Sequence, residues 1–69
     1  MDATTYTAEL PATEDYAVIT HDTLMNGRRI WVARVFFKGR KRYQVIDAAS
    51  EGLIRSRCRA LGATDIRTA

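Results

Sequence analysis

The chain has 69 residues and a mass of 7.8 kDa, which allows one small domain and excludes two-domain enzymes and nucleotide-binding folds. Apolar residues make up 46% of it, too many for a disordered tail, and Cys58 is the single cysteine, which excludes an intrachain disulfide. Residues 1–27 carry five carboxylates and no Lys or Arg, whereas residues 28–69 carry all 11 basic residues and three carboxylates, so the net charge of +3 is unevenly divided. This asymmetry favours a polyanion or an acidic protein surface as partner, unless the acidic segment folds back on the basic body.

Residues 1–15 are predicted to form an acidic N-terminal arm or an edge strand, and residues 16–69 a single domain. Tyr6, Ala8 and Leu10 alternate with polar residues, as in a strand, before Pro11. The first 12 residues lack the basic start and apolar stretch of a signal peptide, and no stretch of the chain has the about 20 apolar residues of a membrane span. With one free thiol, these features predict a soluble, cytoplasmic protein with no membrane partner.

The pair Asn26-Gly27 predicts a β-hairpin, because Asn and Gly tolerate the positive φ angles of a two-residue type I′ turn. The flanking strands are expected over residues 16–25 and 28–37. A two-residue turn would place Val18 opposite Val35 and Tyr16 opposite Phe37.

A second turn is expected at Lys38-Gly39-Arg40, followed by a strand over residues 41–46. A three-residue loop there would place Tyr43 opposite Val35. The alternation of side chains then sorts the sheet into two faces. The face expected to form the core carries Tyr16, Val18, Thr20, Trp31, Ala33, Val35, Phe37, Tyr43 and Val45. The other face carries Ala17, Ile19, His21, Ile30, Val32, Arg34, Phe36, Arg42, Gln44 and Ile46.

A helix follows, with Asp47 or Ser50 as its N-cap and Gly62 ending it. Its apolar arc is formed by Ala49, Leu53, Ile54, Cys58, Ala60 and Leu61. Arg57 falls inside this arc, so it either extends past the edge of the core or pairs with a carboxylate such as Asp47 or Asp65. Residues 63–68 are expected to return as a short edge strand. The predicted fold is therefore α+β: an antiparallel sheet of three or four strands, with one helix from the C-terminal half covering the face of Trp31, Val35 and Tyr43.

The residues predict no enzyme, no cofactor and no metal site. The single histidine, His21, is expected in a strand, and Cys58 on the apolar side of the helix, where a thiol behaves as a small hydrophobic group. The four glycines are too far apart for a phosphate-binding loop, and the carboxylates have no metal-ligand spacing.

Two features predict binding instead. The second sheet face would expose Ile19, Ile30, Val32, Phe36 and Ile46, which indicates cover by the N-terminal segment, a homodimer interface or a foreign partner. Arginine outnumbers lysine nine to two, and arginine suits bidentate contacts to phosphate or carboxylate. The candidate partner-binding residues are Arg28, Arg29, Arg34, Phe36, Lys38, Arg40, Lys41, Arg42, Arg55 and Arg59.

The segment Trp31-Val32-Ala33-Arg34-Val35, followed by Gly39, a strand and a helix, resembles AP2-type and integrase arm-binding domains over residues 28–61. Those domains lay a three-stranded sheet in the DNA major groove with a helix behind it. The resemblance implies Arg34, Arg42 and Arg29 as DNA contacts.

Residues 43–69, with Ala48-Ala49-Ser50 leading into a helix and Gly62-Ala63-Thr64-Asp65-Ile66-Arg67 after it, resemble small phage-encoded proteins. Several anti-CRISPR proteins have this size and sheet-plus-helix build and act by docking on a CRISPR effector complex. Most of these are acidic, so the basic body here implies a grip on an acidic protein surface or a nucleic-acid backbone rather than DNA mimicry. We therefore expect a non-enzymatic, phage-type inhibitor that docks on a macromolecular complex. A DNA-binding accessory module and a homodimeric structural subunit are the alternatives.

Overall fold

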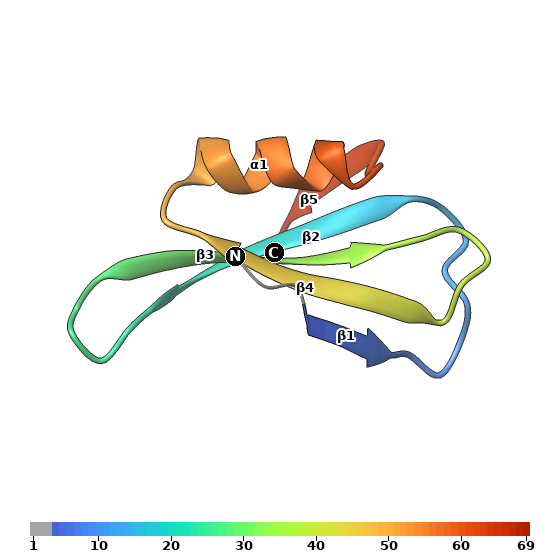
Figure 1. Ribbon diagram of the computed structural model, residues 1–69, viewed down its shortest axis with the longest axis horizontal. Helices are drawn as coiled ribbons and strands as arrows, with labels where there is room; N and C mark the ends of the chain where they lie inside the picture. Colours follow the sequence, from blue (N-terminus) through green and yellow to red (C-terminus); the bar gives the residue numbers. More distant parts are fainter. Residues whose placement is uncertain (1–3) are drawn as a thin grey trace.

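A five-stranded sheet carries one helix on one of its faces (Figure 1). The computed structural model describes residues 4–69, with the elements β1 (Thr4–Thr7), β2 (Tyr16–Thr23), β3 (Arg29–Phe36), β4 (Arg42–Ala48), α1 (Glu51–Ala60) and β5 (Asp65–Thr68). The strand order is β1-β4-β3-β2-β5, and β5 runs parallel to β2 while the other pairs are antiparallel. The predicted α+β fold is confirmed, including the helix in the C-terminal half and the short final strand.

The turn between β2 and β3 differs from the predicted two-residue turn. The Gly27 amide donates to the Leu24 carbonyl oxygen at 2.9 Å, and Gly27 has a φ of 84°. Asn26 does not share this left-handed conformation; its Oδ1 accepts a hydrogen bond from the Arg28 amide. This pattern is that of a type I turn followed by a glycine bulge, which makes a three-residue loop.

The longer loop shifts the register of the hairpin by one residue. Ala17, not Val18, lies opposite Val35, and Ile19 lies opposite Ala33. Because side chains alternate along a strand, a shift of one residue moves every side chain of β2 to the other face relative to β3.

The same correction applies between β3 and β4. Val35 pairs with Gln44 rather than Tyr43, so β4 is also reversed. The turn here is closed by the Arg40 amide donating to Phe37, and it is tied to the N-terminal segment, because the Gly39 amide donates to Ala12 and the Ala12 amide donates to Arg40. The sequence around the turn does not reveal this distant pairing.

The core lies between the sheet and α1. The half-buried side chain of Trp31 packs against this core, on the face of the sheet that the sequence predicted. The buried residues are Ala17, Ile19, Ala33, Val35, Ile46, Ala48, Ile54, Cys58 and Ala63. Ala17, Ile19 and Ile46 were thus expected on the wrong face, and the register places Tyr16, Val18, Thr20, Tyr43 and Val45 on the face opposite α1. Alanine occupies three sheet positions of the core, and its small side chain allows a helix to approach closely.

Helix α1 begins after Ser50, whose Oγ accepts a hydrogen bond from the Leu53 amide at 3.2 Å. Of the two predicted N-caps, Ser50 is therefore the one used, and Asp47 belongs to β4. The helix ends at Ala60 with Leu61 as its C-cap, and Gly62 follows with a φ of 106°, as expected for the residue after a C-cap.

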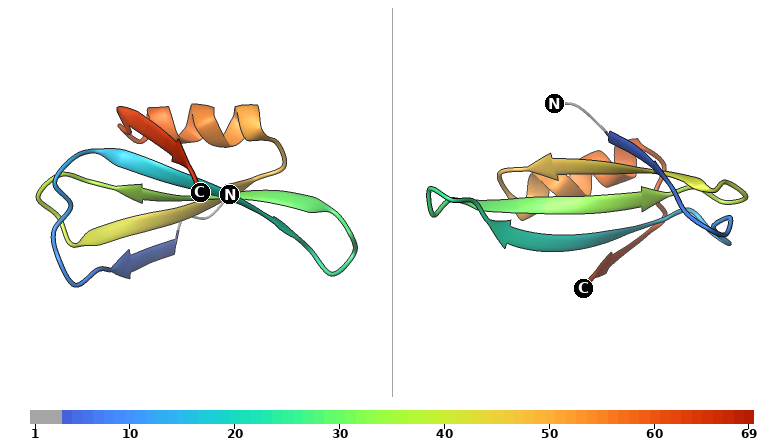
Figure 2. Two further views of the ribbon diagram at one scale, coloured as in Figure 1. Left: turned by 180° about the vertical axis from the view of Figure 1, so that it is seen from behind. Right: turned by 90° about the horizontal axis from the view of Figure 1, so that it is seen from below.

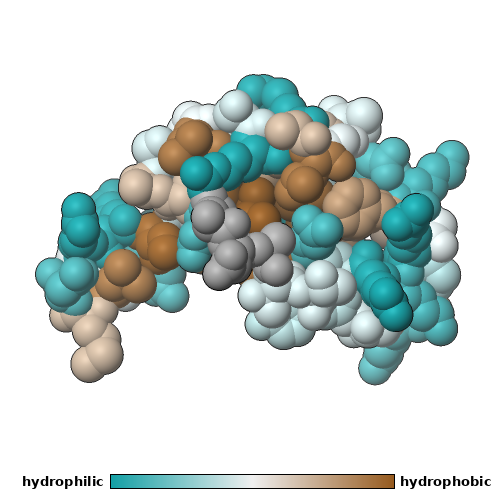
Figure 3. Space-filling model, in the orientation of Figure 1, coloured by the Kyte–Doolittle hydropathy of each residue, from teal (hydrophilic) through white to brown (hydrophobic). Residues whose placement is uncertain are grey.

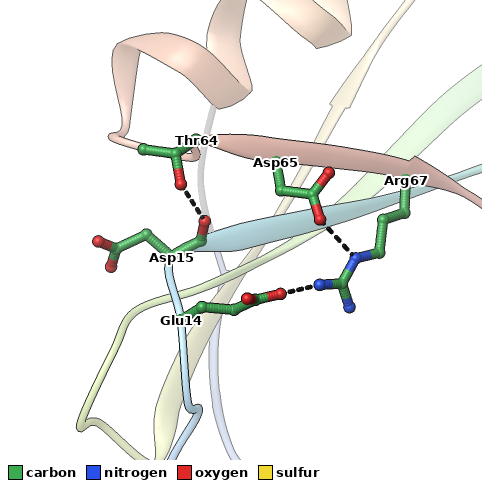
Figure 4. A network of polar contacts seen from close by, with 5 residues as sticks. All are labelled: Glu14, Asp15, Thr64, Asp65 and Arg67. Carbon is green, nitrogen blue, oxygen red and sulfur yellow. Dashed lines mark hydrogen bonds and ion pairs between the residues drawn. The ribbon is translucent and has the colours of Figure 1, made fainter.

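Strand β5 is fastened to the start of β2 by polar contacts (Figure 4). The amide and the Oγ1 of Thr64 both donate to the Asp15 carbonyl oxygen, at 3.1 and 3.0 Å. Arg67 pairs with Asp65 at 2.8 Å and with Glu14. Two acidic residues of the N-terminal segment thus fold onto the body of the protein, and one of them neutralises an arginine.

Candidate functional site

The predicted basic residues lie in separate parts of the molecule. Arg28 and Arg29 lie at the hairpin end of β3, whereas the β3–β4 turn, with Lys38, Arg40, Lys41 and Arg42, lies at the opposite end of the sheet (Figure 2). Arg55 and Arg59 lie on α1, where Arg55 Nε pairs with Glu51 at 3.0 Å. The residues therefore do not form one continuous basic surface.

The three arginines of the AP2-type resemblance do not share a face of the sheet. Arg34 lies on the face opposite α1, with Phe36, whereas Arg29 and Arg42 alternate onto the side of Trp31 and Ile46. The expectation that Arg34, Arg42 and Phe36 share one face is therefore wrong, because it rested on the shifted register.

A groove of about 730 Å³ lies between the β2–β3 hairpin and the N-terminal half of α1. The hairpin projects beyond this end of the helix, and hydrophobic residues gather between the two (Figures 1 and 3). The groove is lined by Leu24, Arg28, Arg29, Ile30, Asp47, Ala48, Ala49, Leu53 and Arg57. Both predicted basic residues of the hairpin therefore border the groove.

The apolar part of the groove is open to solvent. Leu24 is 46% exposed and Leu53 is 42% exposed. Leu53 was expected in the apolar arc that packs on the sheet, but α1 buries only Ile54 and Cys58 fully. The sequence did not predict the groove, because the groove forms only where the β2–β3 hairpin extends beyond the end of α1.

Arg57 connects the helix to the floor of the groove. Its Nη1 donates to the carbonyl oxygen of Asp47 at 2.9 Å. The hydrogen bond fixes the guanidinium beside β4, so three arginines and one aspartate border the apolar surface. The groove consequently combines exposed leucines with a positive rim.

The uncovered face of the sheet carries a row of four stacked aromatic rings. Ring centroids are 5.8 Å apart between Tyr6 and Tyr43, 4.9 Å between Tyr43 and Phe36, and 4.6 Å between Phe36 and Tyr16. The Arg67 guanidinium lies 4.3 Å from the Tyr16 ring centroid and closes the row. We call these four rings the aromatic row. Only Phe36 was a sequence-level candidate, because Tyr16 and Tyr43 were assigned to the core.

The aromatic row is not an open platform for nucleic-acid bases. The planes of successive rings differ by 13° to 27°, so the rings cover one another's faces. Base stacking needs an uncovered ring face. Tyrosine and phenylalanine are instead enriched at protein interfaces.

Cys58 and His21 occupy unrelated environments. The Cys58 side chain is fully buried, and this burial raises the pKa of its thiol, while the positive charges of Arg55 and Arg59 lower it by less. His21 is exposed, and its ring and the Trp31 ring lie edge to face, with centroids 5.3 Å apart. Cys58 therefore has the character of a core residue.

We expect Cys58 to react with iodoacetamide at least about a hundredfold more slowly in the folded protein than in urea, because the thiol is reached only through opening of the fold. The measurement is mass spectrometry of the alkylated fraction over time. A rate in native buffer equal to that of the unfolded chain would contradict the buried position.

Among residues 4–69, no three His, Cys, Asp or Glu side chains gather into a set that could hold a metal ion. Within the same range, no helix is long and apolar enough to cross a membrane. Comparisons with protein-family models, with curated proteins and with solved structures found no match for this chain.

Proposed function

We propose that this protein is a non-enzymatic docking protein that binds an acidic, partly apolar segment of a protein partner in the groove between the β2–β3 hairpin and α1. The observation that carries the proposal is the placing of two exposed leucines, Leu24 and Leu53, beside Arg28 and Arg29. Apolar side chains of the partner would bury the leucines, and its carboxylates would pair with the arginines.

The expected contributions suit a specific complex. Complete burial of a leucine side chain stabilises binding by about 1.5–3 kcal/mol, and Leu24 and Leu53 each have nearly half of their surface available. Arginine is enriched among the residues that contribute most to protein interfaces, and its planar guanidinium pairs with a carboxylate through two parallel hydrogen bonds.

A protein partner is favoured over duplex DNA by the chemistry of the two sides of the sheet. Phosphates need cations but gain nothing from exposed leucines. The uncovered face, which an AP2-like domain would lay on DNA, offers Arg34 and Arg67 but also Asp22, Asp47 and Asp65. Arg67 is already paired with Asp65 and Glu14. This face is close to neutral, unlike a DNA-binding surface.

Inhibition of a nucleoprotein complex, such as a CRISPR effector, belongs to the same class of function and remains our proposal for the biological role. Its support is the small size, the α+β build and the groove with a positive rim. The groove narrows the expected target to an acidic protein surface of such a complex rather than its nucleic acid.

The test is an NMR titration of the ¹⁵N-labelled protein with a synthetic peptide that alternates leucine with aspartate and glutamate. We expect the amide signals of Leu24, Arg28 and Leu53 to shift, and those of the β3–β4 turn to stay in place. A peptide with serine in place of leucine should bind at least about tenfold more weakly, since it loses the apolar contacts.

Two charge-reversal variants provide a matched comparison. Arg28→Glu with Arg29→Glu should reduce affinity for the peptide by about thirtyfold or more, whereas Arg40→Glu with Lys41→Glu changes the net charge equally at the other end of the sheet and should have little effect. Equal losses for both variants, or tighter binding of a short DNA duplex than of the peptide at physiological salt, would refute a groove selective for protein.

A further inference from the structure

The face of the sheet opposite α1 is apolar over most of its length, and no element of residues 4–69 packs on it. Seven of its apolar residues are half-buried and Tyr6 is 49% exposed. The apolar members of this face are Tyr6, Tyr16, Val18, Ile30, Val32, Phe36, Tyr43 and Val45. A continuous apolar surface of this kind marks an interface.

We propose that this face binds a second copy of the chain, so that two sheets pack face to face in a symmetric dimer. The shape of the face supports this occupant. The aromatic row stands at one end, and the smaller side chains of Asp22 and Ile30 lie at the other end, six residues further along β2 and β3. If the strands of the two copies run antiparallel, the large rings of the aromatic row of each copy lie over the end of the other copy that carries the smaller side chains.

The charges on the face favour the same orientation. Arg34 is exposed, lies between Val18 and Val45, and forms no ion pair within residues 4–69. Asp47 and Asp22 lie on the hairpin side of Arg34. A two-fold axis perpendicular to the strands carries the carboxylate end of one copy towards Arg34 of the other. A two-fold axis along the strands would instead bring like positions together, with Arg34 near Arg34 and aromatic row on aromatic row.

The size of the face is sufficient for a stable dimer. The extents of the molecule, 38 and 22 Å, set an upper limit of about 800 Å² on the area of this face, which matches the contribution of each partner to a standard protein interface. Two sheets packed in this way would form a sandwich with an apolar interior. Helix α1 and the leucines of the groove lie on the other side of the sheet, and the groove meets this face only at Ile30 and Asp47.

The test is sedimentation equilibrium of the purified full chain over a range of concentrations. We expect a mass of twice 7.8 kDa at high micromolar concentration. Arg34→Asp should raise the dissociation constant of the dimer about thirtyfold or more, because it places like charges opposite Asp47 and Asp22. Arg34→Asp combined with Asp47→Arg should restore the dimer, which a loss of folding would not do.

Val32→Glu provides a second disruption, and Leu53→Glu, on the other side of the sheet, provides its control. We expect a folded monomer for Val32→Glu and a dimer for Leu53→Glu, with far-UV circular dichroism unchanged in both. A wild-type protein that is monomeric at all concentrations overturns the proposal. A dimer that persists in Arg34→Asp and in Val32→Glu also overturns it, because its interface would then lie elsewhere.

Discussion

The substitution Ile19→Asp is expected to unfold the protein. Ile19, on β2, is 1% exposed and its side chain lies in the core, so an aspartate there would bury a carboxylate without a partner. The cost of burying such a charge exceeds about 4 kcal/mol. A core of this size supplies about 3–5 kcal/mol in total, so the folded population should fall below detection. Circular dichroism and the dispersion of amide proton signals measure the loss.

The neighbouring substitution Val18→Asp is the matched control. Val18 is half-exposed on the uncovered face, between Arg34 and Arg67, where a carboxylate keeps contact with water and gains nearby cations. We expect a loss of less than about 1 kcal/mol in the free energy of unfolding, measured by urea titration at low micromolar concentration to avoid any contribution from a dimer.

The pair of variants also separates the two possible registers. With a two-residue turn at Asn26-Gly27, Val18 would lie in the core and Ile19 outside it, so the effects would be reversed. Unfolding by Val18→Asp together with tolerance of Ile19→Asp would therefore contradict the observed sheet.

The sequence was sufficient for the elements because their signals are local. Glycines at the turns, alternating or β-branched strands and Ser50 at the helix N-terminus each act over a few residues. The final strand was predicted because the chain turns back after Gly62. The strands over residues 16–23 and 29–36 were predicted independently of the type of turn between them.

The faces of the sheet required information that the local pattern does not contain. Asn-Gly is compatible with a two-residue turn or with a three-residue turn that uses Gly27 alone at positive φ, and the two differ by one residue in register. In β2 both alternating sets contain β-branched residues, because Val18 alternates with Ile19. The choice was made by tertiary packing, in which Ala17 and Ala33 allow the helix to approach.

The sequence predicted the chemical character of the candidate site but not its position in the fold. The excess of arginine predicted a binding surface that contains arginines, and Arg28 and Arg29 do border the groove. Leu24 and Leu53 were missed because each belongs to an ordinary apolar pattern, and only the length of the hairpin relative to α1 leaves them exposed. The aromatic row was missed because it joins β1, β2, β3 and β4, and those pairings depend on register.

Of two adjacent residues of α1, Ile54 is expected to contribute mainly to the stability of the fold and Leu53 mainly to binding. Ile54 is fully buried against the sheet, so Ile54→Ala should lower the free energy of unfolding by about 2–5 kcal/mol through lost burial and a remaining cavity. In a domain with about 3–5 kcal/mol of stability, most molecules would then be unfolded at 37 °C. Thermal and urea denaturation measure the change.

Leu53→Ala should have the opposite profile. Leu53 is 42% exposed at the groove, so its truncation should cost less than about 1 kcal/mol of stability, while affinity for the leucine-containing acidic peptide falls about tenfold. A large loss of stability with unchanged peptide affinity would assign Leu53 to the core and remove the apolar half of the groove. Because the two residues are neighbours on one helix, any general weakening of α1 would affect both variants alike, and only a docking role for Leu53 separates their effects.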